Sequence, residues 1–556
     1  MPRKQDDCLK VERRQFKRRA TQRIGRLALL LVCVLSVSLA VPAQHEGHEA
    51  GEMVPREILA RPLPLRQGIG AVHEKVTTSS SDAQAFCDQG LAYLNSFVWI
   101  EAARSFNQAL RLDPSLAMAH LGLSDAYIGL QDVSSARAAF EKAQALSGNV
   151  SERERARITI RARQLDYLED GANLQKYFAY RQAITDAIRV MPDDPWLWIL
   201  RGFADEGSPL AHGQGGSADT IAFYQAALSF SPDNFAAHHY LAHTFENLAL
   251  TKEALDQSEA YVRLAPAIPH AHHMVGHDLR RLGRTEEAIQ EFLKAEQLEN
   301  AYYKAEDIPA RYDWHHAHNL NLLAMCYQAL GQMKAAEIAY REAFALPAYV
   351  DLAEYNRKSW PQFLLDVERP QEALVAAQEL IASRWALARF GGHALSGQAF
   401  LAMGRTEEAR KELSLAEQES EHVPASVIAR LPDAATLHAE ILLQEKQWDQ
   451  GNKLMNQIED SIEAVPGPDA WSEALFEFDS IARAARQAGD WDLAESTAQR
   501  MIRHDPSYAG GYYALGLVAQ HRGDSANAQQ AFATAEKLWS KADPDVQRSR
   551  SQNHNP

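Results

Sequence analysis

A helical repeat of 34 residues constrains the fold of this chain more than any other feature of its sequence. The stretches HYLAHTFE (239–246) and HMVGHDLR (273–280) begin 273 − 239 = 34 residues apart, and each contains two histidines spaced i, i+4. An alanine follows at the same offset in both copies, as Ala254 and Ala288. Side chains spaced i, i+4 share one helical face, so the period predicts stacked pairs of helices.

The same repeat is clearest near the N-terminus and resembles the tetratricopeptide (TPR) pattern. In GLAYLNSFVWIEAARSFNQALRLDP (90–114), Gly90, Ala102, Phe106, Ala109 and Pro114 occupy TPR positions 8, 20, 24, 27 and 32. Small residues at positions 8 and 20 let two helices approach closely, and proline at position 32 ends the second helix. The position-20 residue recurs at Ala136, Ala254, Ala288, Ala336, Ala373, Ala409, Ala494 and Ala528, and in a weaker copy at Gly451.

These copies predict an all-α fold, a right-handed α-solenoid of about twelve TPR-like hairpins. Residues 151–232 predict two less regular helical pairs, the second interrupted by GSPLAHGQGG (207–216), which we interpret as a flexible flap over the groove. The repeat is degenerate near 350–390, where Pro361 takes position 8, so we expect a bend or a division there. This separates an N-terminal array, residues 83–350, from a C-terminal array, residues 351–542.

The two flanks of the repeats predict little fixed structure. Residues 44–82 are rich in Pro, Gly, Glu and Ser and predict a flexible linker. Residues 543–556 are polar and predict a disordered tail.

The first 43 residues resemble an export signal. A basic stretch precedes the apolar run LALLLVCVLSVSLAV (27–41), and Val41-Pro42-Ala43 offers small residues for cleavage after Ala43. Fifteen apolar residues are short for a membrane span, which needs about 20, although an uncleaved anchor stays an alternative. The stretch ERRQFKRR also resembles a twin-arginine signal. We therefore expect the periplasm or cell envelope of a bacterium, or secretion.

Charge and cysteine content exclude several classes of function. Loss of residues 1–43 removes ten Lys/Arg and three Asp/Glu, so the net charge changes from −16 to −16 − 7 = −23. Such an acidic chain is a poor candidate for nucleic acid, and we expect membrane contact only through an uncleaved N-terminal segment. Cys87 and Cys326 lie seven repeats apart, so no disulfide framework is predicted.

The repeated histidines fall on the stripe of each first helix that lines the concave groove of a TPR solenoid, at positions 2, 5, 9 and 12. Helix faces in neighbouring repeats lie about 10 Å apart, so imidazoles from both could reach one ion at about 2.0–2.1 Å. Ten of the 21 histidines lie in residues 238–318, where a uniform spread would place about three, so the cluster is not scatter. The stripe residues of three successive repeats are His239, His243 and Glu246, then His273, His277 and Arg280, then His318 and Asn321.

Two interpretations of this stripe stay open. In the first, His239, His243, His273, His277 and His318 bind a Zn, Cu or Fe ion, with Glu246 as a further ligand or as a partner that fixes a tautomer. In the second, the same groove contacts a peptide terminus or carboxylate, and Arg280, Asn321 and His270 contribute.

Other histidines have simpler interpretations. We expect His238 and His272, at position 4, at the edge of the hairpin core. We interpret His315 and His316 as solvated residues at a helix start, which is also an alternative for His270.

Residues 76–345 resemble a group of exported bacterial TPR proteins with no settled biochemical role. VTTSSSDAQAFCDQGLAYLNSFVWIEAARSFNQALRLDPSLAMA (76–119) is similar to their N-terminal block. Three histidine segments also match: His239 with His243, His273-Met274 with His277 and the following RLG, and His318-Asn319. This chain has Val275-Gly276 where the group has Pro-Ser, and Asp278 replaces an aliphatic residue. The resemblance implies that the histidines act as a set and names no reaction.

The sequence therefore predicts an exported TPR scaffold that binds peptide or protein partners in its concave groove, with a His/Glu metal site as an addition. The alternative is a metal-dependent enzyme, hydrolytic or redox, with the ion on groove histidines and an open ligand position. A third class is a structural envelope component. No nucleophile elbow, HExxH motif or dinucleotide fingerprint occurs, so no catalytic residue is predicted.

Overall fold

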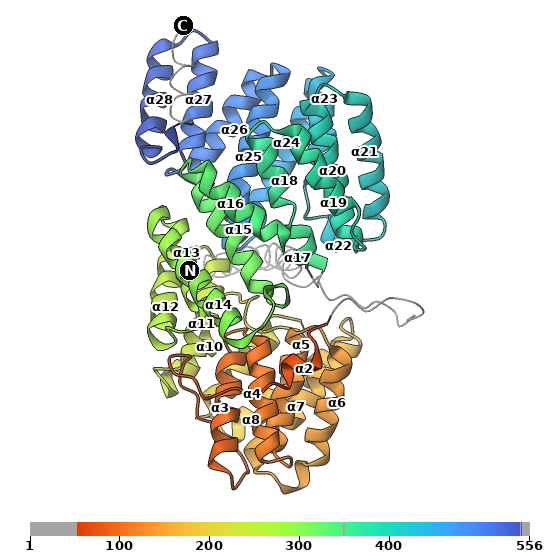
Figure 1. Ribbon diagram of the computed structural model, residues 1–556, viewed down its shortest axis with the longest axis vertical. Helices are drawn as coiled ribbons and strands as arrows, with labels where there is room; N and C mark the ends of the chain where they lie inside the picture. Colours follow the sequence, from red (N-terminus) through yellow and green to blue (C-terminus); the bar gives the residue numbers. More distant parts are fainter. Residues whose placement is uncertain (1–52, 209, 349–350, 545, 547–556) are drawn as a thin grey trace, which may run out of the picture.

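The computed structural model describes residues 53–208, 210–348, 351–544 and 546, and the regular structure of these residues is entirely helical. Successive helices pack as antiparallel hairpins, stacked side by side in a long superhelix (Figure 1). Twelve hairpins can be followed through the described residues, and the predicted α-solenoid is confirmed.

The first seven hairpins make up the N-terminal array. They are α3 (Ser81–Leu94) with α4 (Trp99–Leu112), α5 (Ala117–Gly129) with α6 (Val133–Ala145), α7 (Glu152–Glu169) with α8 (Leu174–Val190), α9 (Pro195–Asp205) with α10 (Ile221–Phe230), α11 (Phe235–Asn247) with α12 (Thr251–Leu264), α13 (Pro269–Arg281) with α14 (Thr285–Glu306), and α15 (Trp314–Ala329) with α16 (Met333–Ala345).

Five hairpins follow in the C-terminal array, and short helices lie between some of them. The hairpins are α18 (Ser359–Asp366) with α19 (Pro370–Ile381), α20 (Ala386–Ala402) with α21 (Thr406–Ser420), α23 (Asp433–Gln444) with α24 (Trp448–Ala464), α25 (Pro468–Ala488) with α26 (Trp491–His504), and α27 (Ala509–His521) with α28 (Ser525–Leu538). The short helices are α2 (Arg56–Leu59), α17 (Asp351–Asn356), α22 (Ala425–Ile428) and the 3₁₀ turns Ser147–Asn149 and Ala310–Tyr312.

The backbone follows the predicted register at every marked repeat. Five residues before each position-20 marker, at position 15, the chain turns between the two helices of a hairpin with a positive φ. A residue in the left-handed backbone conformation commonly ends an α-helix, and glycine adopts this conformation most easily. The position-15 residues are Phe97, Gln131, Ala249, Gly283, Gly331, Glu368, Gly404, Lys446, Gly489 and Gly523.

Helix packing within a hairpin explains the small residue at position 8. A Cβ atom added to Gly90 would lie 2.6 Å from the ring of Phe106, and one added to Gly276 would lie 2.7 Å from the ring of Phe292. Each phenylalanine occupies position 24 of the repeat that contains its glycine. The position-8 glycine therefore makes room for the position-24 ring, and Ala102 and Ala288 at position 20 are fully buried beside it.

The N-terminal array curls until its first hairpin meets the fifth and sixth. The Nδ1 atom of His239 on α11 lies 2.8 Å from the carbonyl oxygen of Asn95, in the turn between α3 and α4. On the other side, the Tyr302 hydroxyl of α14 donates to Glu101 over 2.7 Å. Arg104 of α4 bonds Glu306 over 2.8 Å. These contacts close the array on itself.

The described part of the expected linker is packed rather than free. Val54, Ile58, Leu59, Leu63, Ile69 and Val76 are buried. Arg104 donates to the carbonyl oxygens of residues 61 and 62, and the amide of Ala267 donates to the carbonyl of Gly68 over 2.8 Å. The prediction of little fixed structure is wrong over residues 53–80, because these six apolar side chains are buried and the backbone is hydrogen-bonded to the array. We call residues 53–80 the strap.

The loop at 207–216 is also bonded in place where the structure describes it. The Asn247 side chain of α11 donates to the carbonyl oxygens of Gln214 and Gly216, and the amide of Gly215 donates to Glu206 over 3.0 Å. The two helical pairs predicted for residues 151–232 are confirmed, with this loop inside the second pair. The loop is fastened to α11 rather than free to act as a flap.

The C-terminal array packs against the N-terminal array through α25, which contacts α13 and α15. An ion pair joins Lys541 to Glu286, and the amide of Asp543 donates to the carbonyl of Gly331 over 3.0 Å. The predicted disordered tail is therefore fixed at its first residue, Asp543.

The predicted signal peptide and residues 44–52 of the predicted linker lie outside the described residues. Among the helices that the structure describes, none combines the length and the apolar character that crossing a membrane requires.

Candidate metal centre

Seven histidines from α11, α13 and α15 form one continuous row, which begins beside the turn of the first hairpin and ends beside α25. All are buried except His318, which is partly buried. They form three overlapping groups, and within each group the three ring nitrogens lie within 4.8 Å of one another. The groups are His239, His243 and His270; His270, His273 and His315; and His273, His277 and His318.

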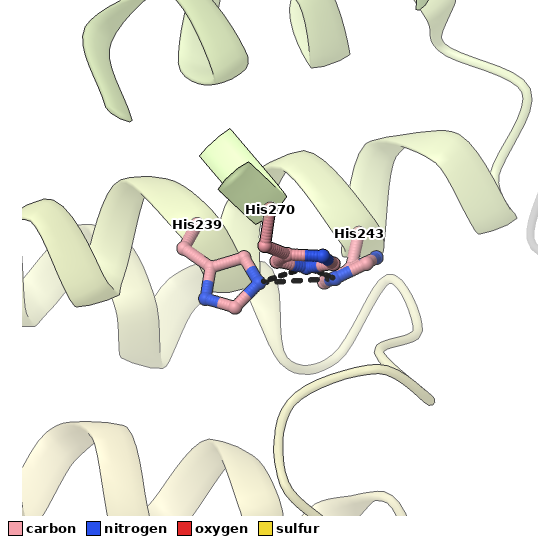
Figure 2. A group of neighbouring side chains, drawn as sticks. All are labelled: His239, His243 and His270. Atoms are coloured by element: carbon pink, nitrogen blue, oxygen red, sulfur yellow. Dashed lines mark hydrogen bonds between the residues drawn. The ribbon is translucent and has the colours of Figure 1, made fainter. Parts of the chain in front are cut away.

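The first group brings three Nε2 atoms together (Figure 2). The Nε2 atom of His239 lies 3.1 Å from that of His243 and 3.0 Å from that of His270, and the third distance is 3.4 Å. Three ligands at about 2.0–2.1 Å from a tetrahedral ion lie about 3.3–3.4 Å from one another. The spacing is therefore close to that of three protein ligands on one ion.

Hydrogen bonds on the far side of two rings fix which nitrogen carries the proton. The Nδ1 atom of His239 faces the carbonyl of Asn95, and that of His243 lies 3.0 Å from Glu246. Both partners accept only, so each Nδ1 carries the hydrogen and each Nε2 keeps its lone pair. At most one hydrogen, from His270, can lie among the three Nε2 atoms, whereas a cation would satisfy all three.

The surroundings keep these rings neutral. Burial lowers the pKa of His239 and of His270 well below the usual value, and the neighbouring imidazoles add to that effect. The ring of Phe97 lies above the group, with centroids 4.6 Å from His239 and 5.2 Å from His270. Neutral imidazole in a covered pocket is the form that binds a metal ion.

Glu246 connects the first group to the third. Its two carboxylate oxygens accept from the Nδ1 atoms of His243 at 3.0 Å and of His277 at 3.2 Å. Burial alone would raise the pKa of Glu246, but these hydrogen bonds outweigh it and lower the pKa to about 2. The carboxylate orients both rings and leaves their Nε2 atoms for other partners.

In the third group, His273 is held in the same way. Its Nδ1 atom lies 3.0 Å from the side-chain oxygen of Asn319, whose amide nitrogen donates to the carbonyl of Phe292. Beside it, the Nε2 atom of His277 lies 3.2 Å from Asp469, the second residue of α25.

The structure corrects three assignments. Arg280, predicted as a ligand contact, bonds Asp505 over 2.7 Å and stacks on Trp471, so it is used between the arrays. His315 and His316 are buried and both bond Glu299, so the interpretation as solvated residues is wrong. The reason is the long helix α14, which brings Glu299 over the start of α15.

The remaining predicted residues have varied surroundings. His270 is not a solvated helix-start residue, because it is buried and belongs to two of the groups. Asn321 is partly buried on α15. His238 and His272 bond Gln257 and Glu291 at the hairpin edge, as expected.

Four residues that the sequence analysis assigned to no site contribute to the cluster. His315 stands three residues before His318, a spacing that a wider search of the helix face would have found. Asn319 appeared only through the family resemblance. Asn95 and Asp469 come from distant hairpins, and no periodicity along the chain marks them.

A cavity of about 330 Å³ lies beside the row. His270 and His315 form part of its wall, and Tyr93, Phe97, Trp99, Tyr302 and Trp314 supply aromatic sides. The strap closes it through Arg66, Gln67 and Ile69. The volume suits a small organic molecule.

Comparison with known proteins identifies the repeats. Models of the tetratricopeptide repeat match residues 87–150, 317–348 and 480–545. No curated protein matches the chain.

Solved structures with some similarity include a human IFIT1 dimer with PPP-AAAA, which shares 12% identity over 83% of this chain and 95% of that chain, with a TM-score of 0.36. A tetratricopeptide repeat protein from Parabacteroides merdae shares 15% identity over 50% and 96%, with a TM-score of 0.32. The APC/C hetero-tetramer Cut9-Hcn1 shares 10% over 84% and 96%, with a TM-score of 0.32. These values are too low to transfer a partner or ligand to this chain.

The stacked hairpins with their shared turn position define the class of α-solenoid repeat proteins. Within that class the matched models and the marker residues agree on one repeat, and the chain is a tetratricopeptide repeat protein. Proteins of this kind serve as scaffolds for interactions with other proteins.

Proposed function

We propose that this chain is an exported TPR scaffold that holds a transition-metal ion on His239, His243 and His270. The observation that carries the proposal is the approach of three Nε2 atoms to within 3.0–3.4 Å, with two of the three Nδ1 hydrogens already bonded to protein acceptors. Three imidazoles suit Zn, Cu or Fe.

The proposed location rests on the N-terminal sequence, where a basic stretch, an apolar run and small residues follow one another. The proposed partner, a peptide or protein, rests on the repeat family. In the N-terminal array, the strap lines the cavity beside His270 and His315, and α25 packs on α13 and α15, so we place the partner elsewhere along the solenoid.

Elemental analysis of protein purified without a histidine tag tests the metal site. We expect the variant His239→Ala/His243→Ala to lose about one equivalent of metal relative to the natural chain. His238→Ala is the matched control, because His238 lies on the same helix but bonds Gln257 and the carbonyl of Pro232. Equal metal content in the double variant and the natural chain would refute the site.

The cavity beside His270 and His315 favours a second candidate function, that of a metal-dependent enzyme acting on a small organic substrate. An enzyme needs a coordination position that opens to the cavity, whereas a structural ion has none. Cobalt-loaded protein separates the two: azide binding would change the visible spectrum only if a position is open. An unchanged spectrum would leave the scaffold as the function.

A further inference from the structure

We propose that a second transition-metal ion binds His273, His277 and His318 together with Asp469, a carboxylate supplied by the C-terminal array. The proposal rests on the proposed metal function of the histidine row, and it adds a separate set of ligands to the first site. The ion would lie where α13, α15 and α25 meet.

The four side chains converge from three helices. The ring nitrogens of the three histidines lie within 4.8 Å of one another. The two carboxylate oxygens of Asp469 lie 3.2 Å from the Nε2 atom of His277 and 3.6 Å from that of His318. Ligand atoms on one tetrahedral ion stand about 3.3–3.4 Å apart, so the two contacts of Asp469 are close to that spacing, and an ion would draw the histidine nitrogens closer together.

The hydrogen bonds of the rings leave lone pairs at this point. The Nδ1 hydrogens of His273 and His277 are directed at the oxygen of Asn319 and the carboxylate of Glu246. Their Nε2 atoms are buried and have no hydrogen-bond partner, and the same holds for the Oδ1 atom of Asp469. Buried acceptors that face one another are costly without a cation between them.

A proton alone does not resolve this arrangement. A proton on the Nε2 atom of His277 would pair it with Asp469 but would leave the Nε2 atom of His273 without a partner. A metal ion accepts electron pairs from His273, His277, His318 and Asp469 together. The carboxylate also reduces the positive charge that three neutral imidazoles would leave on a buried divalent ion.

The two sites use different nitrogens. The Nε2 atom of His270 faces His239 and His243, so it belongs to the first site. His273 offers only Nε2, because its Nδ1 is bonded to Asn319, so it can bind one ion. The middle group of His270, His273 and His315 would compete for that atom and contains no carboxylate, and we therefore assign it to the group with Asp469.

A consequence is that the second ion fastens the two arrays together. Asp469 lies in the first turn of α25, whereas its three histidine partners lie in the N-terminal array. Half of its side chain is open to solvent although Oδ1 points inward, so replacement by asparagine preserves the fold.

The test is metal content of the natural chain and of three variants, each checked for folding by circular dichroism. We expect about two ions in the natural chain, about one in Asp469→Asn or in His239→Ala/His243→Ala, and none in the combined variant. Asp492→Asn is the matched control, because Asp492 also stands in the first turn of a helix and pairs with exposed Arg522.

The outcomes separate the two proposals. If the Asp469→Asn variant keeps the metal content of the natural chain and its affinity in a chelator competition within twofold, the second site is wrong. The first site then stands or falls on the His239/His243 variant. If His239→Ala/His243→Ala keeps the metal content of the natural chain while Asp469→Asn loses one ion, the first site is wrong and the second holds. Absence of metal after reconstitution with zinc, copper and iron would overturn both.

Discussion

Arg280 and Asp505 form a buried ion pair between the two arrays, with 2.7 Å between Nη1 and Oδ2 and each side chain 4% exposed. The guanidinium also stacks on Trp471, at 5.0 Å from the ring centroid. Burial raises the pKa of Asp505, but the charge of Arg280 and the hydrogen bonds from Ser507 and Arg280 together outweigh it and hold the pKa below the usual value. The pair therefore exists in its charged form at neutral pH.

Replacing Arg280 with Met should destabilise the protein strongly, because Asp505 would stay buried without its counter-charge. We expect a loss of about 3–5 kcal/mol in the free energy of unfolding, measured with urea. Adding Asp505→Asn should recover part of it. The exposed pair of Arg284 and Glu287 provides the comparison, and Arg284→Met should have little effect. Equal effects of the two arginine variants would contradict the role of the buried pair.

Gly276→Ala should disturb both packing and metal binding. Its Cβ atom would lie 2.7–2.9 Å from the ring of Phe292, which contacts His273 and His277. Overpacking of this kind costs about 1–3 kcal/mol, and we expect weaker metal binding in the same variant. Gly148→Ala is the control, since nothing lies near its added Cβ. Unchanged thermal stability of Gly276→Ala would argue against the close packing.

Glu206 should make stability fall as pH rises. Burial raises the pKa of this carboxyl to about 8, well above the unfolded value of 4.5. The neutral form is favoured in the fold, so the contribution to stability is complete below pH 4.5 and is lost as pH rises through about 8.

Glu206→Gln should remove that dependence, because the side-chain amide oxygen can still accept from the backbone amide of Gly215 while its NH2 group donates to the hydroxyl oxygen of Tyr224. At pH 8 we expect the variant to be more stable by about 2–4 kcal/mol, and at pH 4.5 the two proteins should match. Glu253→Gln, at an exposed position, should show no such difference. The idea fails if urea titrations at the two pH values give the same difference for Glu206→Gln.

Removing metal should lower the melting temperature. An ion that binds only the folded state at 1,000 times its dissociation constant adds about 4 kcal/mol. We expect a chelator to lower the melting temperature of the natural chain, but not that of the combined variant that lacks both sites. A chelator effect of equal size in the combined variant would show that the ions bind elsewhere.

The fold could be predicted because its information is local. The alanine at position 20 and the turn five residues before it recur within each hairpin, and all ten turns take the same left-handed conformation. Even Phe97 and Lys446, which are not glycines, adopt it because the two helices on either side require it. The degenerate repeats kept this geometry although their sequences are weak.

Of the candidate site, only the residues that recur with the 34-residue repeat could be predicted. His239, His243, His273, His277 and His318 occupy the same stripe of successive repeats, which the 34-residue spacing marks in the sequence. Asn95 reaches the histidine row because the N-terminal array closes on itself, and Asp469 reaches it because the C-terminal array packs against α13 and α15. Both arrangements depend on small rotations between neighbouring hairpins that accumulate over many repeats. The packing of the strap could not be predicted, because its average composition hides six apolar side chains that become buried.

The strap also bears on how the chain reaches its native state. Most solenoids form by contacts between neighbouring repeats, and folding can spread from any of them. Here Arg66 must pair with Glu306, and Gly68 with Ala267, across some two hundred residues. Such distant contacts slow folding, because a long loop must close before they form. During synthesis the strap therefore cannot take its final place until the sixth hairpin has been made, and binding of the strap by another molecule before then would leave the array open.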